Sequence, residues 1–262
     1  MFLWLASAML IATPGIASQR LKSQPACSAW QDHFGTGTLN TMLWTAASGQ
    51  APGYIANTHI GYFLPGNVSL ANGLLTLTLT QQTGTVGTNP SGVISNGGMI
   101  HTNFTCGYGT YAWRMRMSSA TSCPMCTGVP VSGSVSAGFI YVNNSQTEID
   151  FEFAANYSPK VWLVNWLNPN PRRDPTSNAE TSTAVLPASP FDTYHDYKFI
   201  WTAGKIEFYI DGTLTGTHTT NVPSAPAYFM ITHWGSNSTG WGGLATPGTT
   251  RYFYVTHASY TP

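Results

Sequence analysis

The chain has 262 residues, and its ten Lys and Arg residues balance its ten Asp and Glu residues, so the formal net charge is zero. Charged residues make up only 8% of the sequence, well below the ~25% of typical soluble domains. Because there is no basic surplus, no electric field would attract nucleic acid, anionic lipid or a sulfated polymer. We therefore expect neither a nucleic-acid partner nor a charged substrate.

Residues 1–17 are mostly apolar and end in the small-residue sequence Gly15-Ile16-Ala17. This pattern predicts a secretory signal peptide, which leaves residues 18–262 as a single domain outside the cell. A short membrane anchor is the alternative, but Pro14 interrupts the stretch and it falls short of the ~20 residues that span a bilayer. Since no later segment is a candidate span, we expect no membrane association after processing.

The rest of the chain alternates between apolar and polar residues in short runs separated by Gly, Pro and Asn, which is typical of β-strands. Such runs occupy residues 75–80, 111–117, 139–142, 160–167, 197–201, 205–210, 228–233 and 251–257. Asp211-Gly212 follows one of them and predicts a tight turn. Residues 123–136 and 168–190 read as long loops of the kind that wall a binding cleft. The pattern predicts an all-β fold, a jelly-roll sandwich.

The four cysteines are expected to form disulfides in an exported protein, and three pairings are possible. We favour a local Cys123–Cys126 bridge together with a Cys27–Cys106 bridge. A pair of cysteines two residues apart could instead suggest a metal site, but zinc sites need further ligands. No pair of histidines has the spacing of a metal motif, so we expect no metal and no cofactor.

One predicted strand carries an unusual concentration of acid. Glu148, Asp150 and Glu152 alternate with Ile149, Phe151 and Phe153. Because neighbouring side chains of a strand point to opposite faces, one face is apolar and the other holds three carboxyl groups.

Two carboxyl groups that flank a glycosidic bond are the minimum needed to hydrolyse it, and crowding raises the pKa of at least one of them. Calcium ligation and a solvated face are the alternatives. Calcium sites, however, also use backbone carbonyls in turns, and a solvated face would carry mixed charges. A neutral chain with nine Trp, 13 Tyr and 12 Phe suits an uncharged, hydroxyl-rich polymer. We therefore expect a polysaccharide partner.

The run Glu148–Phe153 resembles the E-I-D-[IF]-E-F signature of glycoside hydrolase family 16. Further similarities extend over about residues 30–260, and they include Gly107–Tyr111, Phe191, His195–Tyr197, Trp201, Ile206–Gly212, Pro223–Pro226, Trp234 and Trp241–Gly243. The resemblance implies that Glu148 is the nucleophile, Glu152 the general acid/base and Asp150 the residue that tunes them. It also implies a retaining mechanism in an open cleft on the concave face of the sandwich.

The motif lacks the extra residue found in laminarinase-like, agarase and carrageenase branches, so it resembles lichenases and xyloglucan transglycosylases. We expect a monomeric endo-hydrolase of mixed-linkage β-1,3-1,4-glucan, with β-1,3-glucan as the next substrate. The alternatives are a β-glucan or xyloglucan transglycosylase and a non-catalytic, lectin-like binder.

Four further residues are predicted to contact the sugar. Trp234 and Trp241 match family positions near the cleft, and Asn165 matches an asparagine that the family uses near its substrate. Trp166 is a fourth candidate, but it has the opposite strand parity to Asn165, so both can face the cleft only if a bulge intervenes.

Overall fold

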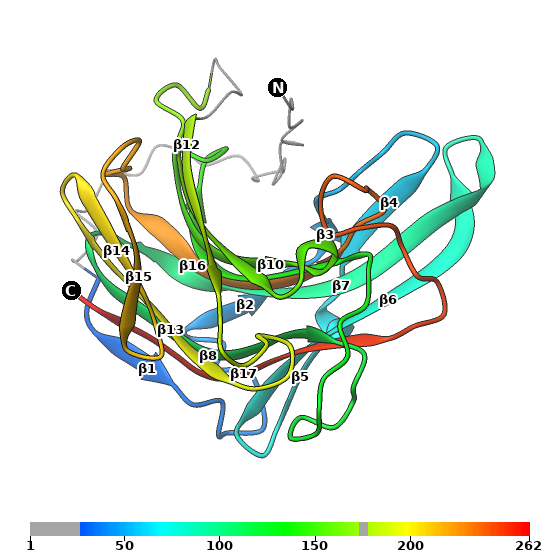
Figure 1. Ribbon diagram of the computed structural model, residues 1–262, viewed down its shortest axis with the longest axis horizontal. Coiled ribbons are helices and arrows are strands. Elements are labelled where there is room, and N and C mark those ends of the chain that lie inside the picture. The colour runs from blue at the N-terminus through cyan, green and yellow to red at the C-terminus, as the bar shows by residue number, and fades with distance from the viewer. Residues whose placement is uncertain (1–26, 173–177) are drawn as a thin grey trace.

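The computed structural model describes residues 27–172 and 178–262, which form two curved sheets packed face to face (Figure 1). The predicted signal peptide, residues 1–17, lies outside the described residues. The inner, concave sheet has the order β2–β7–β16–β9–β10–β11–β12. Its strands are β2 (Trp44–Ala46), β7 (Asn89–Cys106), β16 (Ala227–Gly235), β9 (Ser134–Val142), β10 (Thr147–Ala154), β11 (Lys160–Leu167) and β12 (Asn178–Val185).

The outer sheet runs from β15 through β14, β13 and β8 to β17, which pairs on its other side with β6 and β1. Its strands are β15 (Thr213–His218), β14 (Lys205–Ile210), β13 (His195–Thr202), β8 (Gly109–Ser119), β17 (Arg251–Thr261), β6 (Leu74–Val86) and β1 (Trp30–Asp32), with β5 (Val68–Ala71) at the edge of β6.

The long strands β6 and β7 connect the two sheets. The first half of β6 belongs to the outer sheet, while its second half pairs with the first half of β7 as a projecting hairpin. β4 (His59–Phe63) extends this hairpin by pairing parallel to β7, and β3 (Gly49–Gln50) pairs with β4. The remaining elements are two short 3-10 turns, η1 (Pro65–Asn67) and η2 (Ala155–Tyr157).

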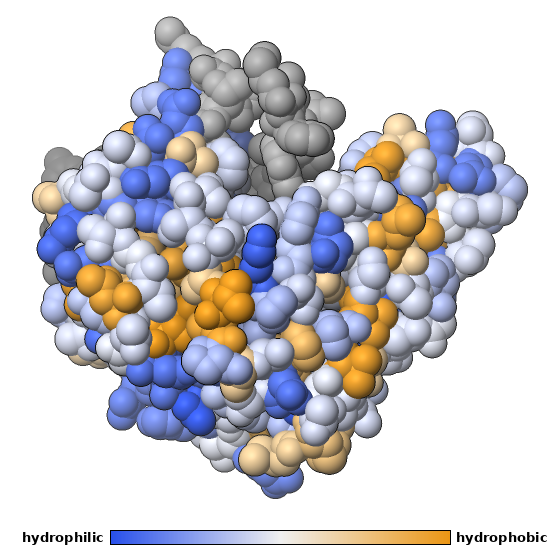
Figure 2. Space-filling view, in the orientation of Figure 1, coloured by the Kyte–Doolittle hydropathy of each residue, from blue (hydrophilic) through white to orange (hydrophobic). Residues whose placement is uncertain are grey.

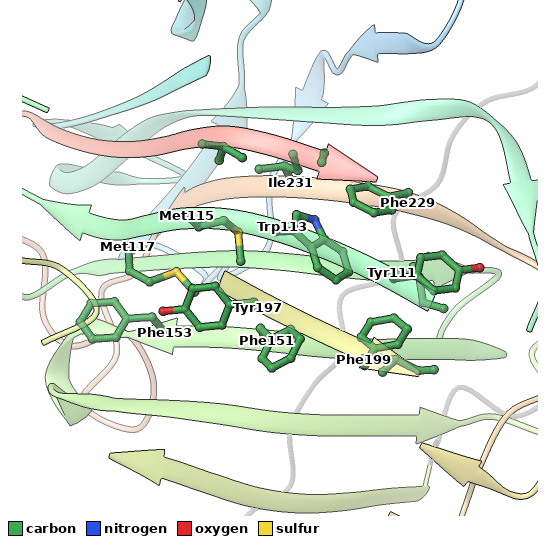
Figure 3. Packing of buried hydrophobic residues seen from close by; sticks show 14 of the residues in the cluster. Tyr111, Trp113, Met115, Met117, Phe151, Phe153, Tyr197, Phe199, Phe229 and Ile231 are labelled. Carbon is green, nitrogen blue, oxygen red and sulfur yellow. The ribbon is translucent and has the colours of Figure 1, made fainter. Parts of the chain in front are cut away.

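The hydrophobic core lies between the two sheets and is rich in aromatic rings. Figure 3 shows rings from the inner sheet, such as Phe151 and Phe229, meeting rings from the outer sheet. Trp113 of β8 stacks on Phe229 at 4.4 Å between ring centroids and meets Phe151 edge-on at 6.1 Å. Because a buried aromatic side chain removes 150–250 Å² from water, these rings hold the sheets together and fix which face of each inner strand points outward.

The predicted all-β sandwich is confirmed, and each predicted strand run lies within an observed strand. Asp211 and Gly212 form the expected turn with positive φ angles of 50° and 78°. The predicted loop 168–190 is wrong in part, because β12 lies inside it. The sequence of β12, Asn-Ala-Glu-Thr-Ser-Thr-Ala-Val, lacks apolar alternation since it is a largely uncovered edge strand. The predicted loop 123–136 likewise ends early, since β9 begins at Ser134.

Both favoured disulfides, Cys27–Cys106 and Cys123–Cys126, are present. The first ties the segment before β1 to the end of β7. None of the helical turns in the described part of the chain is long and apolar enough to cross a membrane. On the face seen in Figure 2, apolar residues form separate patches among neutral and hydrophilic ones.

Candidate active site

The acidic strand β10 lies inside the inner sheet, with β9 on one side and β11 on the other. Its register with both neighbours is continuous, so the strand has no bulge. Ile149, Phe151 and Phe153 are fully buried in the core between the sheets. The alternation of β10 therefore places Glu148, Asp150 and Glu152 together on the concave face.

The neighbouring strands surround these carboxyl groups with aromatic and small side chains. Glu148 is paired in register with Tyr141 of β9 and Trp166 of β11. Glu152 is paired with Ala137 and Trp162 of the same two strands. Cross-strand partners share a face, so the first carboxyl group lies between two large rings, and the second lies between a small residue and a ring.

Burial dominates the electrostatics of the three carboxyl groups. It raises the pKa of Glu148 from 4.5 to about 7, although a hydrogen bond donated by the Ser145 hydroxyl opposes this rise. Burial, followed by repulsion from Glu148, raises the pKa of Glu152 from 4.5 to about 8. Asp150 is only 4% exposed, and burial together with both neighbouring carboxylates raises its pKa well above the usual range.

An aromatic cluster surrounds Glu152. The indole Nε1 of Trp241 donates a hydrogen bond to Glu152 Oε1 at 3.2 Å. The ring of Trp162 meets that of Trp241 edge-on at 5.1 Å, and Tyr157 of η2 lies 5.6 Å from Trp162 and 5.9 Å from Trp241. The phenol of Tyr157 donates to the carbonyl of Gly240, which ties η2 to the loop that carries Trp241. Partly exposed rings of this kind suit the C–H faces of a sugar.

Trp166, which pairs with Glu148, and Trp241, which donates to Glu152, lie on the side of the carboxyl groups. Trp234 lies on the same face of β16, but it is only 7% exposed and packs with Ala47, Phe63 and Met99. A side chain on Gly53 would meet its ring at 2.9 Å. Trp234 is therefore part of the packed floor beside the carboxyl groups, and little of its ring is open to a ligand.

The prediction for Asn165 is wrong. Asn165 pairs with Ile149 and is fully buried on the opposite face of β11. Its Nδ2 donates to the carbonyls of Thr220 and Asn221, and its Oδ1 lies 2.7 Å from Nδ1 of His218. The parity of an unbulged strand decides this point: Trp162 and Trp166 face the carboxyl groups, and the asparagine between them cannot.

Sequence reasoning missed Ser145, Tyr157 and Trp162 as members of the site. The parity of β11 could have identified Trp162, because it shares a face with Trp166. Ser145 and Tyr157 lie in the segments just before and just after β10, where no alternation indicates which way a side chain points. Within residues 27–172 and 178–262, no group of three or more His, Cys, Asp and Glu residues could hold a metal ion.

Comparison with known proteins gives a consistent result. The sequence profile of glycosyl hydrolases family 16 matches residues 60–252. A β-glucanase of Paenibacillus polymyxa is 28% identical over 230 residues, which cover 84% of each chain. A β-glucanase of Bacillus amyloliquefaciens is 29% identical over 208 residues, covering 78% of this chain and 74% of the relative.

Solved structures agree with the sequence relatives. The Bacillus licheniformis β-glucanase superposes with a TM-score of 0.70 and 26% identity, over 90% of this chain and 99% of that one. A β-1,3-1,4-glucanase (lichenase) from a mouse hindgut metagenome has a TM-score of 0.71 and 23% identity, covering 90% and 100% of the two chains. Because the lichenase is only 23% identical, its similarity supports the fold and says nothing of the activity.

Proposed function

The chain belongs to glycosyl hydrolases family 16, and we propose that it is a secreted endo-β-glucanase that cleaves internal bonds of mixed-linkage β-1,3-1,4-glucan with retention of configuration. The observation that carries this proposal is the pair of glutamates, Glu148 and Glu152, four residues apart on one face of an unbulged strand. Their environments differ, which is the condition for giving two carboxyl groups two different roles.

The family resemblance assigns Glu148 as the nucleophile and Glu152 as the general acid/base, and burial raises the pKa of both groups. The hydrogen bond from Ser145 favours the ionised form of Glu148, and the charge of Glu148 favours the protonated form of Glu152. The Glu148 carboxylate attacks the anomeric carbon, and Glu152 protonates the leaving glycosidic oxygen. Water then hydrolyses the glycosyl ester after losing its proton to Glu152, which restores both groups.

Asp150 lies between these two groups and has its own pKa raised by both of them. A proton held on Asp150 reduces the negative charge next to Glu148, so the nucleophile can stay ionised at a buried position. This accounts for a third carboxyl group that neither attacks the sugar nor protonates the leaving group.

Three observations support a neutral β-glucan as the substrate. The chain carries no net charge. The rings of Trp162, Trp166 and Trp241 lie beside the carboxyl groups on the concave face. Relatives at 28–29% identity are named β-glucanases. The unbulged β10 supports the mixed-linkage polymer ahead of β-1,3-glucan. Export rests on the composition of residues 1–17, and amino-terminal sequencing of the exported protein tests it.

The purified protein should release oligosaccharides from barley β-glucan faster than from laminarin, xyloglucan or agarose. Glu148→Ala and Glu152→Ala should each lower kcat by at least about a thousandfold. Azide added to Glu152→Ala should restore turnover and give a β-glycosyl azide, whereas azide added to Glu148→Ala should give the α-anomer, because azide then takes the nucleophile's place.

Full activity in either alanine variant would exclude this assignment. Products longer than a defined donor would instead identify a transglycosylase, which uses the same covalent intermediate but passes the sugar to another glucan. Binding of glucan without any release of reducing sugar would identify a lectin-like protein.

A further inference from the structure

The turn between β9 and β10 has an unusual backbone. Three consecutive residues other than glycine, Asn143, Asn144 and Ser145, have positive φ angles of 45°, 51° and 58°. Asparagine adopts this left-handed region readily, but serine has the full steric conflict of an L-residue without the local compensation. Such a conformation persists only where the surroundings impose it, and it is often found at functional sites.

The surroundings of the turn do impose it. Asn168, fully buried just after β11, donates its backbone N–H to the carbonyl of Ser145 at 2.7 Å and its Nδ2 to the carbonyl of Asn144 at 3.1 Å. Within the turn, the backbone N–H of Gln146 donates to the carbonyl of Asn143 at 3.1 Å. The turn is thus held by Asn168, which follows β11, and by a hydrogen bond within its own backbone.

This arrangement buries the side chain of Ser145, which is 8% exposed, and directs its hydroxyl to Oε2 of Glu148, to which it donates a hydrogen bond. Glycine would suit the backbone better but has no hydroxyl to offer. The position therefore combines a conformation that disfavours serine with a contact that requires a hydroxyl.

We infer that Ser145 is a positioning residue that holds one oxygen of the Glu148 carboxylate and leaves the other, Oε1, to attack the anomeric carbon. The inference rests on the role of Glu148 as nucleophile proposed above. As the bond from Oε1 to the anomeric carbon forms, the bond to the glycosidic oxygen breaks and the proton of Glu152 moves onto that oxygen. Oε2 then becomes the carbonyl oxygen of the glycosyl ester and still accepts the hydrogen bond from Ser145.

The test compares three variants with the wild type, all produced without N-glycosylation because Asn143-Asn144-Ser145 is also a glycosylation sequon. Ser145→Ala removes the hydroxyl and keeps the Cβ. Ser145→Gly removes the hydroxyl and also relieves the backbone conflict, so it separates loss of the contact from strain in the turn. Asn144→Gly places a glycine at another left-handed residue of the same turn and leaves the Ser145 hydroxyl in place, so it serves as the matched control.

Since a hydrogen bond donated to a carboxylate favours its ionised form, both Ser145 variants should raise the pH of the acid limb of kcat/KM by about half a pH unit or more. Their kcat should fall by about tenfold, the usual cost of losing a hydrogen bond to a charged group. Asn144→Gly should match the wild type in both measurements. If Ser145→Gly has the same pH profile of kcat/KM and the same kcat as the wild type, the inference is overturned. Ser145 would then serve only to shape the turn.

A second readout separates this inference from the proposed function. The Glu148 carboxyl group can be titrated by carbon-13 NMR in substrate-free protein, where the Ser145 variants should show a higher pKa than the wild type. If the wild type is inactive but its Glu148 pKa still lies below that of the Ser145 variants, the proposed function is rejected and the hydrogen bond from Ser145 is confirmed. An active wild type with no difference among the variants would keep the function and reject the role of Ser145.

Discussion

Ionised Glu152 should lower the free energy of unfolding, although the same residue is needed for activity. The variant Glu152→Gln tests this. Burial and the charge of Glu148 raise the pKa of Glu152 from 4.5 to about 8. A raised pKa means that the carboxyl group destabilises the fold only when it ionises. Stability is therefore complete below about pH 4.5 and is lost as the pH rises through the folded-state value of about 8.

A tenfold change in a protonation equilibrium corresponds to about 1.4 kcal/mol, so the full cost at alkaline pH is at most about 5 kcal/mol. The side chain retains partial exposure, which makes this figure an upper limit. Because glutamine cannot ionise, Glu152→Gln should abolish turnover but raise Tm at pH 8.5 relative to its effect at pH 4, by up to about 10 °C. Differential scanning calorimetry at the two pH values measures this difference.

Glu180→Gln provides a control of opposite sign. Glu180 of β12 accepts hydrogen bonds from the backbone N–H groups of Thr219 and Thr220 at 2.9 and 2.7 Å. Burial alone would raise the pKa of Glu180, but these hydrogen bonds lower it below the usual value. Its contribution is present at neutral pH and lost in acid, so its replacement should lower Tm at pH 8.5 more than at pH 4. The reasoning fails if Glu152→Gln changes Tm equally at both pH values.

Three further outcomes are expected. The pH profile of kcat/KM should be a bell with its maximum between about pH 7 and 8, set by the coupled titration of Glu148 and Glu152; a maximum below pH 5 would contradict it. Trp241→Phe removes the indole donor that lowers the pKa of Glu152, so the alkaline limb should move to higher pH, and an unmoved limb would mean that the contact has no effect. Replacing Cys27 and Cys106 together by serine should lower the free energy of unfolding in urea by about 4 kcal/mol, because their bridge closes a loop with a sequence separation of 79; an unchanged unfolding midpoint would contradict this.

Much of the fold was predictable from the sequence because β-strands covered on one face leave a two-residue period in the chain. Leu75–Thr80 and Lys205–Ile210 show this period, and both are strands. β12 was missed because an edge strand with little apolar burial does not need alternation. Asn165 was misassigned because the family resemblance pointed to it. Strand alternation in β11 already indicated that Trp166 and Asn165 lie on opposite faces, and the structure places Trp166 on the side of the carboxyl groups.

The sequence by itself determined that three carboxyl groups share one face of a strand, since alternation is a local property of the chain. It also determined the family, because the order and spacing of many residues match at once. Only the tertiary structure decided which groups surround each carboxyl group. Ser145 reaches Glu148 through a turn held by Asn168, and Trp241 reaches Glu152 from 89 residues farther along the chain. Burial and these contacts shift the pKa of each glutamate, and neither is encoded in the order of residues along β10.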